Sequence, residues 1–209
     1  MDNGMPLEKA LECGYQIPGM MWPAELGWLY ETFSGSRSHA EVGVYAGKSL
    51  LVTAAGFMRS CEVTAVDNFS LGALGAEWLQ AVSAATIERI HALTRARITL
   101  QVGSSLEIAR QLAREGRRFD SVFLDGCHEY AECKADIEIW TMLIRPGGIL
   151  AGHDYWPNHW GVMEAVQETG PFEVVPDTRI WFRHLPVNTA STERERPIHS
   201  EHRTPNTEN

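Results

Sequence analysis

The stretch Glu41–Leu50, EVGVYAGKSL, decides the fold. The first residues of this stretch belong to an apolar run from Ser38 to Val44, SHAEVGV. Apolar residues at helical spacing follow from Gly47 to Ser60. The stretch is therefore predicted to be a glycine-containing turn between a buried strand and a helix. Turns of this kind hold phosphates in several enzyme classes, because the start of a helix offers free backbone N–H groups.

The spacing of the glycines argues against the two common nucleotide patterns. A P-loop, Gly-x-x-x-x-Gly-Lys-Ser/Thr, requires glycine where Val42 stands. The dinucleotide pattern Gly-x-Gly-x-x-Gly fails as well, because Tyr45 occupies the place of the second glycine. What remains is Glu-x-Gly-x-x-x-Gly. Lys48 is then predicted to be a solvated residue of the first helical turn rather than a phosphate ligand.

Strand-like and helix-like segments alternate along the chain. The predicted strands cover residues 38–44, 61–67, 96–103, 119–126 and 147–154, followed by a hairpin over 172–185. The predicted helices cover residues 47–60, 77–93, 104–116, 129–144 and 160–169. This alternation predicts an α/β fold with a mostly parallel sheet and helices on both faces.

The 209 residues suit one domain with two appendages. Residues 1–37 are predicted to form an N-terminal helical cap rich in aromatic side chains, and residues 38–185 the main domain. Residues 186–209 contain no aromatic residue and few aliphatic ones. Such a segment buries too little apolar surface to offset its ordering entropy, so it is predicted to be a disordered tail.

Composition and charge argue against several classes of protein. The net charge of −9 argues against binding nucleic acid or an anionic membrane. No stretch reaches the roughly 18 apolar residues of a membrane span, and the N-terminus does not look like a signal peptide. The four cysteines form no Cys-x-x-Cys pair. We interpret them as reduced thiols of a cytoplasmic protein.

Polar side chains stand where the predicted strands end, and ligands of parallel sheets bind at that edge. These residues are Glu41, Asp67, Ser104, Asp125, His153 and Asp154. A random scatter of polar residues would rarely end five strands in this way.

The turn at Gly43 and Gly47 resembles the first motif of class I S-adenosylmethionine (SAM) methyltransferases. The resemblance implies that the backbone approaches SAM closely at both glycines, with Glu41 near the cationic end of the ligand. Asp67, 20 residues after Gly47, would then bind the ribose hydroxyls. In this fold the Gly-Ser-Ser that begins at Gly103 borders the adenine.

The predicted cofactor-binding residues are Glu41, Gly43, Tyr45, Gly47, Ser49, Asp67, Asn68, Ser104, Ser105 and Asp125. Simpler interpretations of some of them stay open. The glycines could form only a tight turn. Asp67 could cap a helix or belong to an NAD site, and Ser104 and Ser105 could be helix caps.

Two later segments, FLDGCHEY (residues 123–130) and PGGILAGHDYW (residues 146–156), each place a carboxylate at a strand end. If the strands are adjacent, Asp125 and Asp154 meet, and two close carboxylates repel unless a proton or cation lies between them. With His153 they offer ligands that Mg²⁺, Mn²⁺ or Zn²⁺ accepts. His128 and His153 are candidate bases for removing a proton from a substrate.

The two segments resemble the metal-dependent small-molecule O-methyltransferases, in the branch of macrocin and other antibiotic-tailoring sugar O-methyltransferases. The resemblance covers residues 41–168 and implies a class I methyltransferase fold of seven strands. It implies that Asp125 and Asp154 bind the cation. His153 stands where these relatives often have an acidic residue. Asp125, His128 and His153 are the predicted catalytic residues.

The sequence therefore predicts a SAM-dependent methyltransferase that acts on a hydroxyl of a small molecule, of sugar or natural-product type, with a divalent cation. The alternatives are a P-loop-like phosphotransferase and a SAM-binding protein without catalysis. Nitrogen as the acceptor atom, and a homo-oligomeric state, also stay open.

Overall fold

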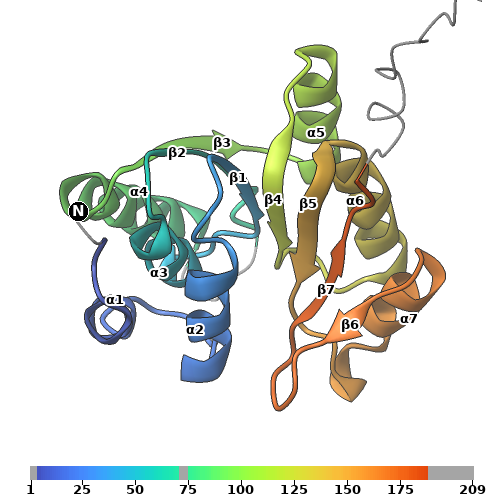
Figure 1. Ribbon diagram of the computed structural model, residues 1–209, viewed down its shortest axis with the longest axis horizontal. Helices are drawn as coiled ribbons and strands as arrows, with labels where there is room; N and C mark the ends of the chain where they lie inside the picture. Colours follow the sequence, from blue (N-terminus) through green and yellow to red (C-terminus); the bar gives the residue numbers. More distant parts are fainter. Residues whose placement is uncertain (1–3, 71–74, 188–209) are drawn as a thin grey trace, which may run out of the picture.

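The computed structural model describes residues 4–70 and 75–187. One seven-stranded sheet runs through it in the order β3-β2-β1-β4-β5-β7-β6 (Figure 1). Strands β1 to β5 are parallel, and β7 pairs antiparallel with both β5 and β6. The strands are Ser38–Val42 (β1), Cys61–Asp67 (β2), Ala96–Val102 (β3), Phe119–Leu124 (β4), Ile144–Gly152 (β5), Glu173–Val174 (β6) and Trp181–His184 (β7).

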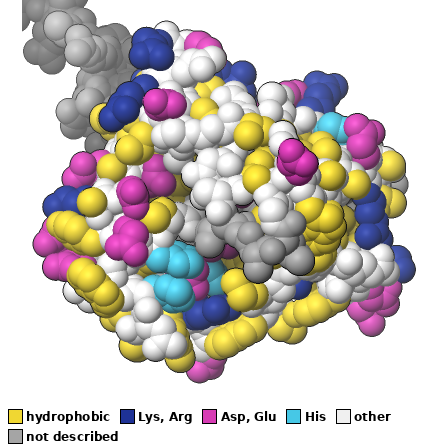
Figure 2. Space-filling model, turned by 180° about the vertical axis from the view of Figure 1, so that it is seen from behind, with side chains coloured by type: hydrophobic (Ala, Val, Ile, Leu, Met, Phe, Trp, Pro, Cys, Tyr) yellow, Lys and Arg dark blue, Asp and Glu magenta, His cyan; other side chains and the backbone are white. Residues whose placement is uncertain are grey.

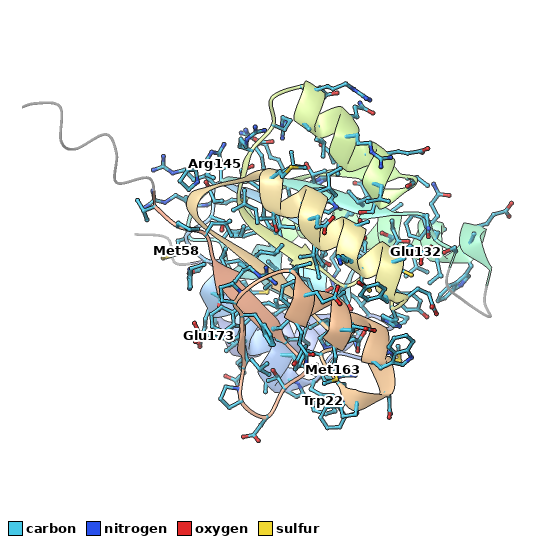
Figure 3. All side chains as sticks on the ribbon, turned by 90° about the vertical axis from the view of Figure 1, so that its right-hand side faces the viewer. Trp22, Met58, Glu132, Arg145, Met163 and Glu173 are labelled. Carbon is cyan, nitrogen blue, oxygen red and sulfur yellow. The ribbon has the colours of Figure 1, made fainter. Side chains whose placement is uncertain are left out.

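Helices cover both faces of the sheet (Figure 1). Helices α1 to α4 lie on one face, and α5 to α7 lie on the other, where α6 and α7 pack side by side (Figure 3). The helices are Leu7–Gly14 (α1), Pro23–Thr32 (α2), Lys48–Gly56 (α3), Ala76–Leu93 (α4), Ser105–Arg114 (α5), Tyr130–Met142 (α6) and Trp160–Glu168 (α7), with a 3₁₀ turn at Pro157–His159 (η1). The predicted α/β architecture is confirmed.

The direction of strand addition reverses between β1 and β4, which are neighbours in the sheet. All five residues of β1 are buried, as expected for a central parallel strand covered on both faces. Val42 pairs with Leu124, and the N–H of Asp125 donates to the carbonyl of Val42 at 2.7 Å. This register brings the turn after β1 against the loop after β4, which is where ligands bind in open α/β sheets.

Strand β5 begins earlier than the sequence predicts. Helix α6 ends at Met142 instead of residue 144, and β5 begins at Ile144 instead of residue 147. The Pro-Gly-Gly segment at residues 146–148 does not separate the two elements, because it lies inside a strand whose register shifts along β4. A side chain on Gly148 would come within 2.6 Å of the carbonyl of Asp120. Glycine there permits the close approach of the two backbones.

The N-terminal segment folds onto α3 through α1 and α2. Helix α2 begins after Trp22, whose N–H donates to Glu25 at 2.8 Å, and Pro23 occupies its first turn. Proline at the first helical position and glutamate at the third are typical of a helix start. Of the predicted tail, residues 188–209 lie outside the described residues.

Candidate active site

The turn after β1 adopts a conformation that only glycine tolerates at two positions. Gly43 and Gly47 have φ angles of +88° and +90°, in the region that side chains rarely enter. A Cβ on Gly43 would lie 2.0 Å from the carbonyl oxygen of Asp125, and one on Gly47 would lie 2.8 Å from Thr86. Both glycines predicted from the sequence are therefore required, because neighbouring residues lie too close to leave space for a side chain. At Gly43 the neighbour is the loop after β4, so this glycine lets the turn pack against that loop.

Asp67, at the end of β2, ties this turn to the next loop. Its carboxylate accepts the backbone N–H of Tyr45 at 2.7 Å and that of Phe69 at 2.6 Å. A carboxylate has about four acceptor positions, so two remain for a ligand. Asp67 is half-buried and faces a cavity.

This first cavity has a volume of about 580 Å³. Seven of the ten predicted cofactor-binding residues line it. They are Gly43, Tyr45, Asp67, Asn68, Ser104, Ser105 and Asp125. These residues come from the ends of several strands, and they line one cavity, which is consistent with the single binding site that the sequence predicts.

Ser105 directs its hydroxyl into a hydrogen-bond network rather than leaving it free. Its Oγ donates to Asp136 at 2.6 Å and accepts the indole N–H of Trp140 at 2.8 Å. Burial raises the pKa of Asp136 to about 6. Asp136 also lines the cavity and was missed in the sequence, because it lies in the middle of α6 and follows no strand.

Glu41 lies behind the cavity wall, fully buried in β1. Ser49, which lines a second cavity, donates its hydroxyl to Glu41 Oε1 at 2.7 Å, while Oε2 has no hydrogen-bond partner. Burial raises the pKa of Glu41 to about 8, and the charges of Asp125 and Asp67 add to this. Glu41 thus supports the turn through Ser49, whereas the sequence placed it beside the ligand.

The raised pKa of Glu41 predicts a pH-dependent stability. The folded state holds a proton that the unfolded chain releases above the ordinary glutamate pKa of 4.5. Stability therefore falls as the pH rises from 4.5 to about 8, by up to about 1.4 kcal/mol per pH unit. Glu41→Gln removes this component, so the gap between variant and wild type in urea unfolding should change across that range. A constant gap would contradict a neutral Glu41.

The second cavity, of about 330 Å³, lies between the turn and the N-terminal segment. Its wall includes Pro18, Met20, Met21 and Lys48. The two cavities share Gly43, Tyr45, Asp125, Gly126 and His128, so they meet at the turn after β1.

The prediction that Lys48 is solvated was wrong. Lys48 is buried, donates to the carbonyl of Gly19 at 2.5 Å and lies over the ring of Tyr15. The reason is that the segment between α1 and α2 covers the start of α3, which a reading of local sequence does not reveal. Its ammonium group contacts that segment and is not placed as a phosphate ligand.

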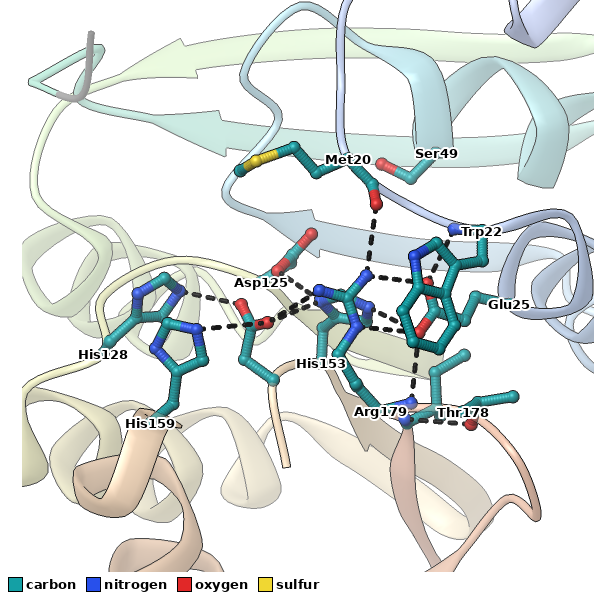
Figure 4. Close-up of polar contacts among 12 residues, drawn as sticks. Met20, Trp22, Glu25, Ser49, Asp125, His128, His153, His159, Thr178 and Arg179 are labelled. Atoms are coloured by element: carbon teal, nitrogen blue, oxygen red, sulfur yellow. Dashed lines mark hydrogen bonds and ion pairs between the residues drawn. The ribbon is translucent and has the colours of Figure 1, made fainter. Parts of the chain in front are cut away.

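Three predicted residues meet beside the turn after β1, where Asp125 lines both cavities and His153 and Asp154 line the second. Figure 4 shows the polar contacts of this cluster. Asp125 follows β4, and His153 and Asp154 follow the adjacent strand β5. His153 Nδ1 lies 3.4 Å from Asp125 Oδ1 and 3.3 Å from Asp154 Oδ1. Asp154 has a φ of +57°, a conformation that aspartate adopts more readily than most residues. The adjacent strand ends therefore bring the two carboxylates together, as expected.

Two residues that the sequence did not identify complete this cluster. Glu25 of α2 is fully buried, and its Oε1 lies 3.2 Å from His153 Nε2. Arg179, in the turn between β6 and β7, donates its Nε and Nη2 to Glu25 at 3.1 Å and stacks over Trp22. Its Nη1 lies 3.7 Å from Asp154. The guanidinium of Arg179 therefore lies near both Glu25 and Asp154, and Figure 4 shows its contacts with Glu25.

The surrounding carboxylates favour a positive charge on His153. Burial opposes that charge, but the carboxylates of Asp125, Asp154 and Glu25, which lie 3.2–3.4 Å from its ring nitrogens, outweigh it and raise the pKa of His153 to about 11. Burial also raises the pKa of Asp125, against the effect of His153. For Glu25, the effect of burial is outweighed by the nearby His153 and by the hydrogen bonds from Arg179, which lower its pKa to about 2.

His128, in the loop after β4, forms a pair with Asp154. Its Nε2 lies 2.8 Å from Asp154 Oδ2. The hydrogen bond with Asp154 raises the pKa of His128 above its ordinary value, although burial opposes the shift. His128 and His153 together keep the pKa of Asp154 well below the usual range, although burial acts the other way.

Asp125, His153 and Asp154 fit a divalent cation. One ligand atom from each can be chosen so that all lie within 4.8 Å of one another. Nδ1 of His153 faces the two aspartates, and its Nε2 faces Glu25. Histidines that bind metals usually direct their second ring nitrogen to a carboxylate in this way. Binding of a cation at Nδ1 would displace the proton that the carboxylates favour there. The resulting donor set of two carboxylates and one neutral imidazole suits Mg²⁺, Mn²⁺ or Zn²⁺.

The chain belongs to the methyltransferase domain family, whose sequence profile matches residues 40–155, more than half of the chain. Its fold is that of the class I O-methyltransferases, as similar solved structures show. No curated protein matches the sequence significantly.

Three solved structures illustrate the fold. An O-methyltransferase from Bacillus cereus in complex with S-adenosylhomocysteine (SAH) has a TM-score of 0.62 at 20% identity, over 86% of this chain and 90% of that chain. CalS11, a TDP-rhamnose 3'-O-methyltransferase of calicheamicin biosynthesis, has a TM-score of 0.55 at 19% identity, over 85% and 79%. MycE, from the mycinamycin pathway, in complex with Mg and SAH, has a TM-score of 0.59 at 17% identity, over 94% and 58%. The predicted methyltransferase class is confirmed.

Proposed function

We propose that this chain transfers a methyl group from SAM to a hydroxyl of a small molecule, of sugar or natural-product type, with the help of a divalent cation. The observation that carries the proposal is the meeting of two cavities at the turn after β1, with Asp125 at their junction and Asp154 beside it in the wall of the second cavity. The first cavity suits the nucleoside of SAM, and the second suits its methionine end together with an acceptor.

Asp67 supports the cofactor assignment. Two acceptor positions of its carboxylate remain free beside the first cavity, enough for a pair of ribose hydroxyls. Gly43 lets the turn pack against the backbone of Asp125, and both residues line the two cavities. The P-loop alternative gains no support, because Lys48 is engaged with Gly19.

His128 is the residue we assign to the acceptor proton. With a proton on Nε2 directed to Asp154, its Nδ1 is free to accept another. Asp154 holds the ring in place and stabilises the charge that develops on it, as the carboxylate does in other carboxylate–histidine pairs. The buried position of His153 suits a ligand rather than a second base.

A cation held by Asp125, His153 and Asp154 would lower the pKa of an acceptor hydroxyl and orient it. The chain itself contributes alignment through the carboxylates of the cluster, and the buried side chain of Met21 covers part of the second cavity. Among the similar structures, MycE was solved with Mg and CalS11 acts on a TDP-sugar. Both facts support a cation and a sugar-type acceptor here. The predicted cytoplasmic location stays a prediction.

Cofactor binding is tested by thermal unfolding with SAM, SAH or ATP. At about 100 times the dissociation constant, a ligand that binds only the folded state adds about 2.7 kcal/mol, which raises the midpoint by roughly 5–10 °C for a chain of this size. We expect SAM and SAH to raise the midpoint of unfolding and ATP to leave it unchanged. Asp67→Asn should weaken SAM about tenfold or more, because it weakens charged hydrogen bonds. Asp177→Asn, on the exposed hairpin turn, is the matched control.

The same preparation, incubated with labelled SAM and a panel of sugar and phenol acceptors, tests the chemistry. Methyl transfer should decline in EDTA and return with Mg²⁺ or Mn²⁺. A midpoint shift with ATP alone would contradict the cofactor assignment. SAM binding with no transfer to any hydroxyl would favour the alternative of a SAM-binding protein without catalysis. Transfer that EDTA leaves unchanged would remove the cation from the proposal.

A further inference from the structure

A second group of possible metal ligands stands beside the first, at the mouth of the site. His128 Nε2 lies 2.8 Å from Asp154 Oδ2, and His159 Nε2 lies 3.8 Å from Asp154 Oδ1. The two imidazole rings are neighbours, with centroids 4.3 Å apart. Ligand atoms of the three residues all lie within 4.8 Å of one another. Figure 4 shows both rings directed at the same carboxylate, and Figure 2 shows a group of histidine side chains on the surface.

The backbone holds these residues together. His159 ends the η1 turn, and α7 begins at the next residue. A Cβ on Gly161, in the first turn of α7, would come within 2.6 Å of the carbonyl of His128. Glycine at this position lets the start of α7 pack against the loop after β4. The two histidines are therefore neighbours because of tight backbone packing, although 31 residues separate them.

The chemistry of this group differs from that of Asp125, His153 and Asp154. It offers two imidazoles and one carboxylate, and its histidines are partly exposed, with side-chain exposures of 39% and 31%. Within residues 4–70 and 75–187, Asp154 is the only charged side chain at ion-pair distance from either ring. Two imidazoles and a carboxylate, with further positions open to water, are typical ligands of Zn²⁺ and related transition ions. Mg²⁺ prefers oxygen ligands.

We propose that His128, His159 and Asp154 form a site for Zn²⁺-class ions, which shares Asp154 with the site at Asp125 but takes its two imidazoles from other residues. Binding of the ion requires Nε2 of His128 and the carboxylate of Asp154. An occupied site would therefore take both residues away from the acceptor proton and inhibit methyl transfer. The inhibition rests on the proposed function, whereas the binding of the ion does not.

Direct metal binding by the full chain tests the site without any enzymatic assay. Calorimetric titration with Zn²⁺, and visible absorption during titration with Co²⁺, should both show a bound ion, and the Co²⁺ spectrum should lack an intense thiolate band. The absence of that band distinguishes the site from Cys127, an exposed thiol nearby. Loss of outer-shell partners weakens metal binding about 10- to 100-fold. We expect His159→Gln, which removes a direct ligand, to weaken Zn²⁺ at least as much.

His184→Gln is the matched control, because His184 is an exposed histidine on β7 outside the group. Asp125→Asn should leave Zn²⁺ binding at the proposed site in place. Equal Zn²⁺ affinity in wild type and His159→Gln would overturn the proposal, and so would loss of binding in Asp125→Asn with His159→Gln unaffected. Circular dichroism of each variant verifies its folding. His159 is a partly exposed surface residue, so its replacement should leave the fold intact.

Methyl transfer provides the second arm. Each protein is titrated with Zn²⁺ at saturating Mg²⁺, and its rate of methyl transfer is compared with its own rate without Zn²⁺. Wild type should be inhibited, and His159→Gln should need at least about tenfold more Zn²⁺ for the same inhibition. If Zn²⁺ binds without inhibiting methyl transfer, the metal site stands, but the proposal that the ion withdraws His128 from the acceptor proton is overturned. Absence of any methyl transfer would contradict the proposed function but not the metal site.

Discussion

Gly43→Ala is expected to abolish SAM binding and to lower the free energy of unfolding by about 2–5 kcal/mol. Part of that cost is the left-handed backbone at φ +88°, which disfavours a Cβ by about 1–2 kcal/mol. The rest comes from overlap with the carbonyl of Asp125, 2.0 Å from the new Cβ, because overpacking typically costs about 1–3 kcal/mol. A backbone carbonyl does not rotate away as a flexible side chain would. The loop that carries Asp125 must therefore move, and the junction of the two cavities moves with it.

Gly116→Ala separates the two causes. Gly116 has a φ of +71°, and nothing lies within 4 Å of a Cβ built on it. The free energy of unfolding of Gly116→Ala should fall only by the backbone cost of about 1–2 kcal/mol, and this variant should bind SAM with the wild-type affinity. Urea unfolding and SAM calorimetry on both variants give the comparison. Equal losses in stability, or SAM binding by Gly43→Ala at the wild-type affinity, would show that the contact with Asp125 does not determine the site.

Local sequence predicted this part of the site well, for a physical reason. Parallel strands end at one edge of the sheet, so the positions of Asp67, Asp125 and Asp154 in the chain are enough to place them near each other. Gly43 was informative because the spacing of the glycines rejected other nucleotide patterns. The role of Glu41 was less accessible. Its position on β1 was correct, but only the structure shows Ser49 between it and the cavity.

Contacts across long sequence separations were not predictable. Glu25 and Arg179 are 154 residues apart, and no periodicity connects an N-terminal helix with a C-terminal hairpin turn. The same cause explains the error at Lys48, which the segment before α2 covers. The contact of His159 with Asp154 was not predictable either, because His159 lies in a 3₁₀ turn, where neither helix nor strand spacing applies. At Glu25, Lys48 and Arg179, the sequence missed the contribution of the N-terminal segment and the C-terminal hairpin to the site.

Glu25→Gln should lower the free energy of unfolding by about 3–5 kcal/mol, the usual cost of breaking a buried ion pair. Glu25 is fully buried, and its carboxylate faces His153 and the guanidinium of Arg179. Glutamine keeps the shape but removes the charge, which leaves two cationic groups without their shared anion. The midpoint of thermal unfolding should fall by roughly 6–20 °C. Glu62→Gln is the matched control, because Glu62 pairs with Arg97 on the exposed surface, where such pairs contribute at most about 1 kcal/mol.

The pH dependence of the loss identifies its cause. Folding lowers the pKa of Glu25 from 4.5 to about 2, so its stabilisation is present above pH 4.5 and disappears as the pH falls through about 2. The difference between wild type and Glu25→Gln should accordingly shrink over that interval. Arg179→Gln should also destabilise, and the double variant should lose less than the sum of the two, because the partners share one interaction. Additive losses, or a loss no larger than that of Glu62→Gln, would mean that the N-terminal helix covers the site without holding His153 and Arg179 in place.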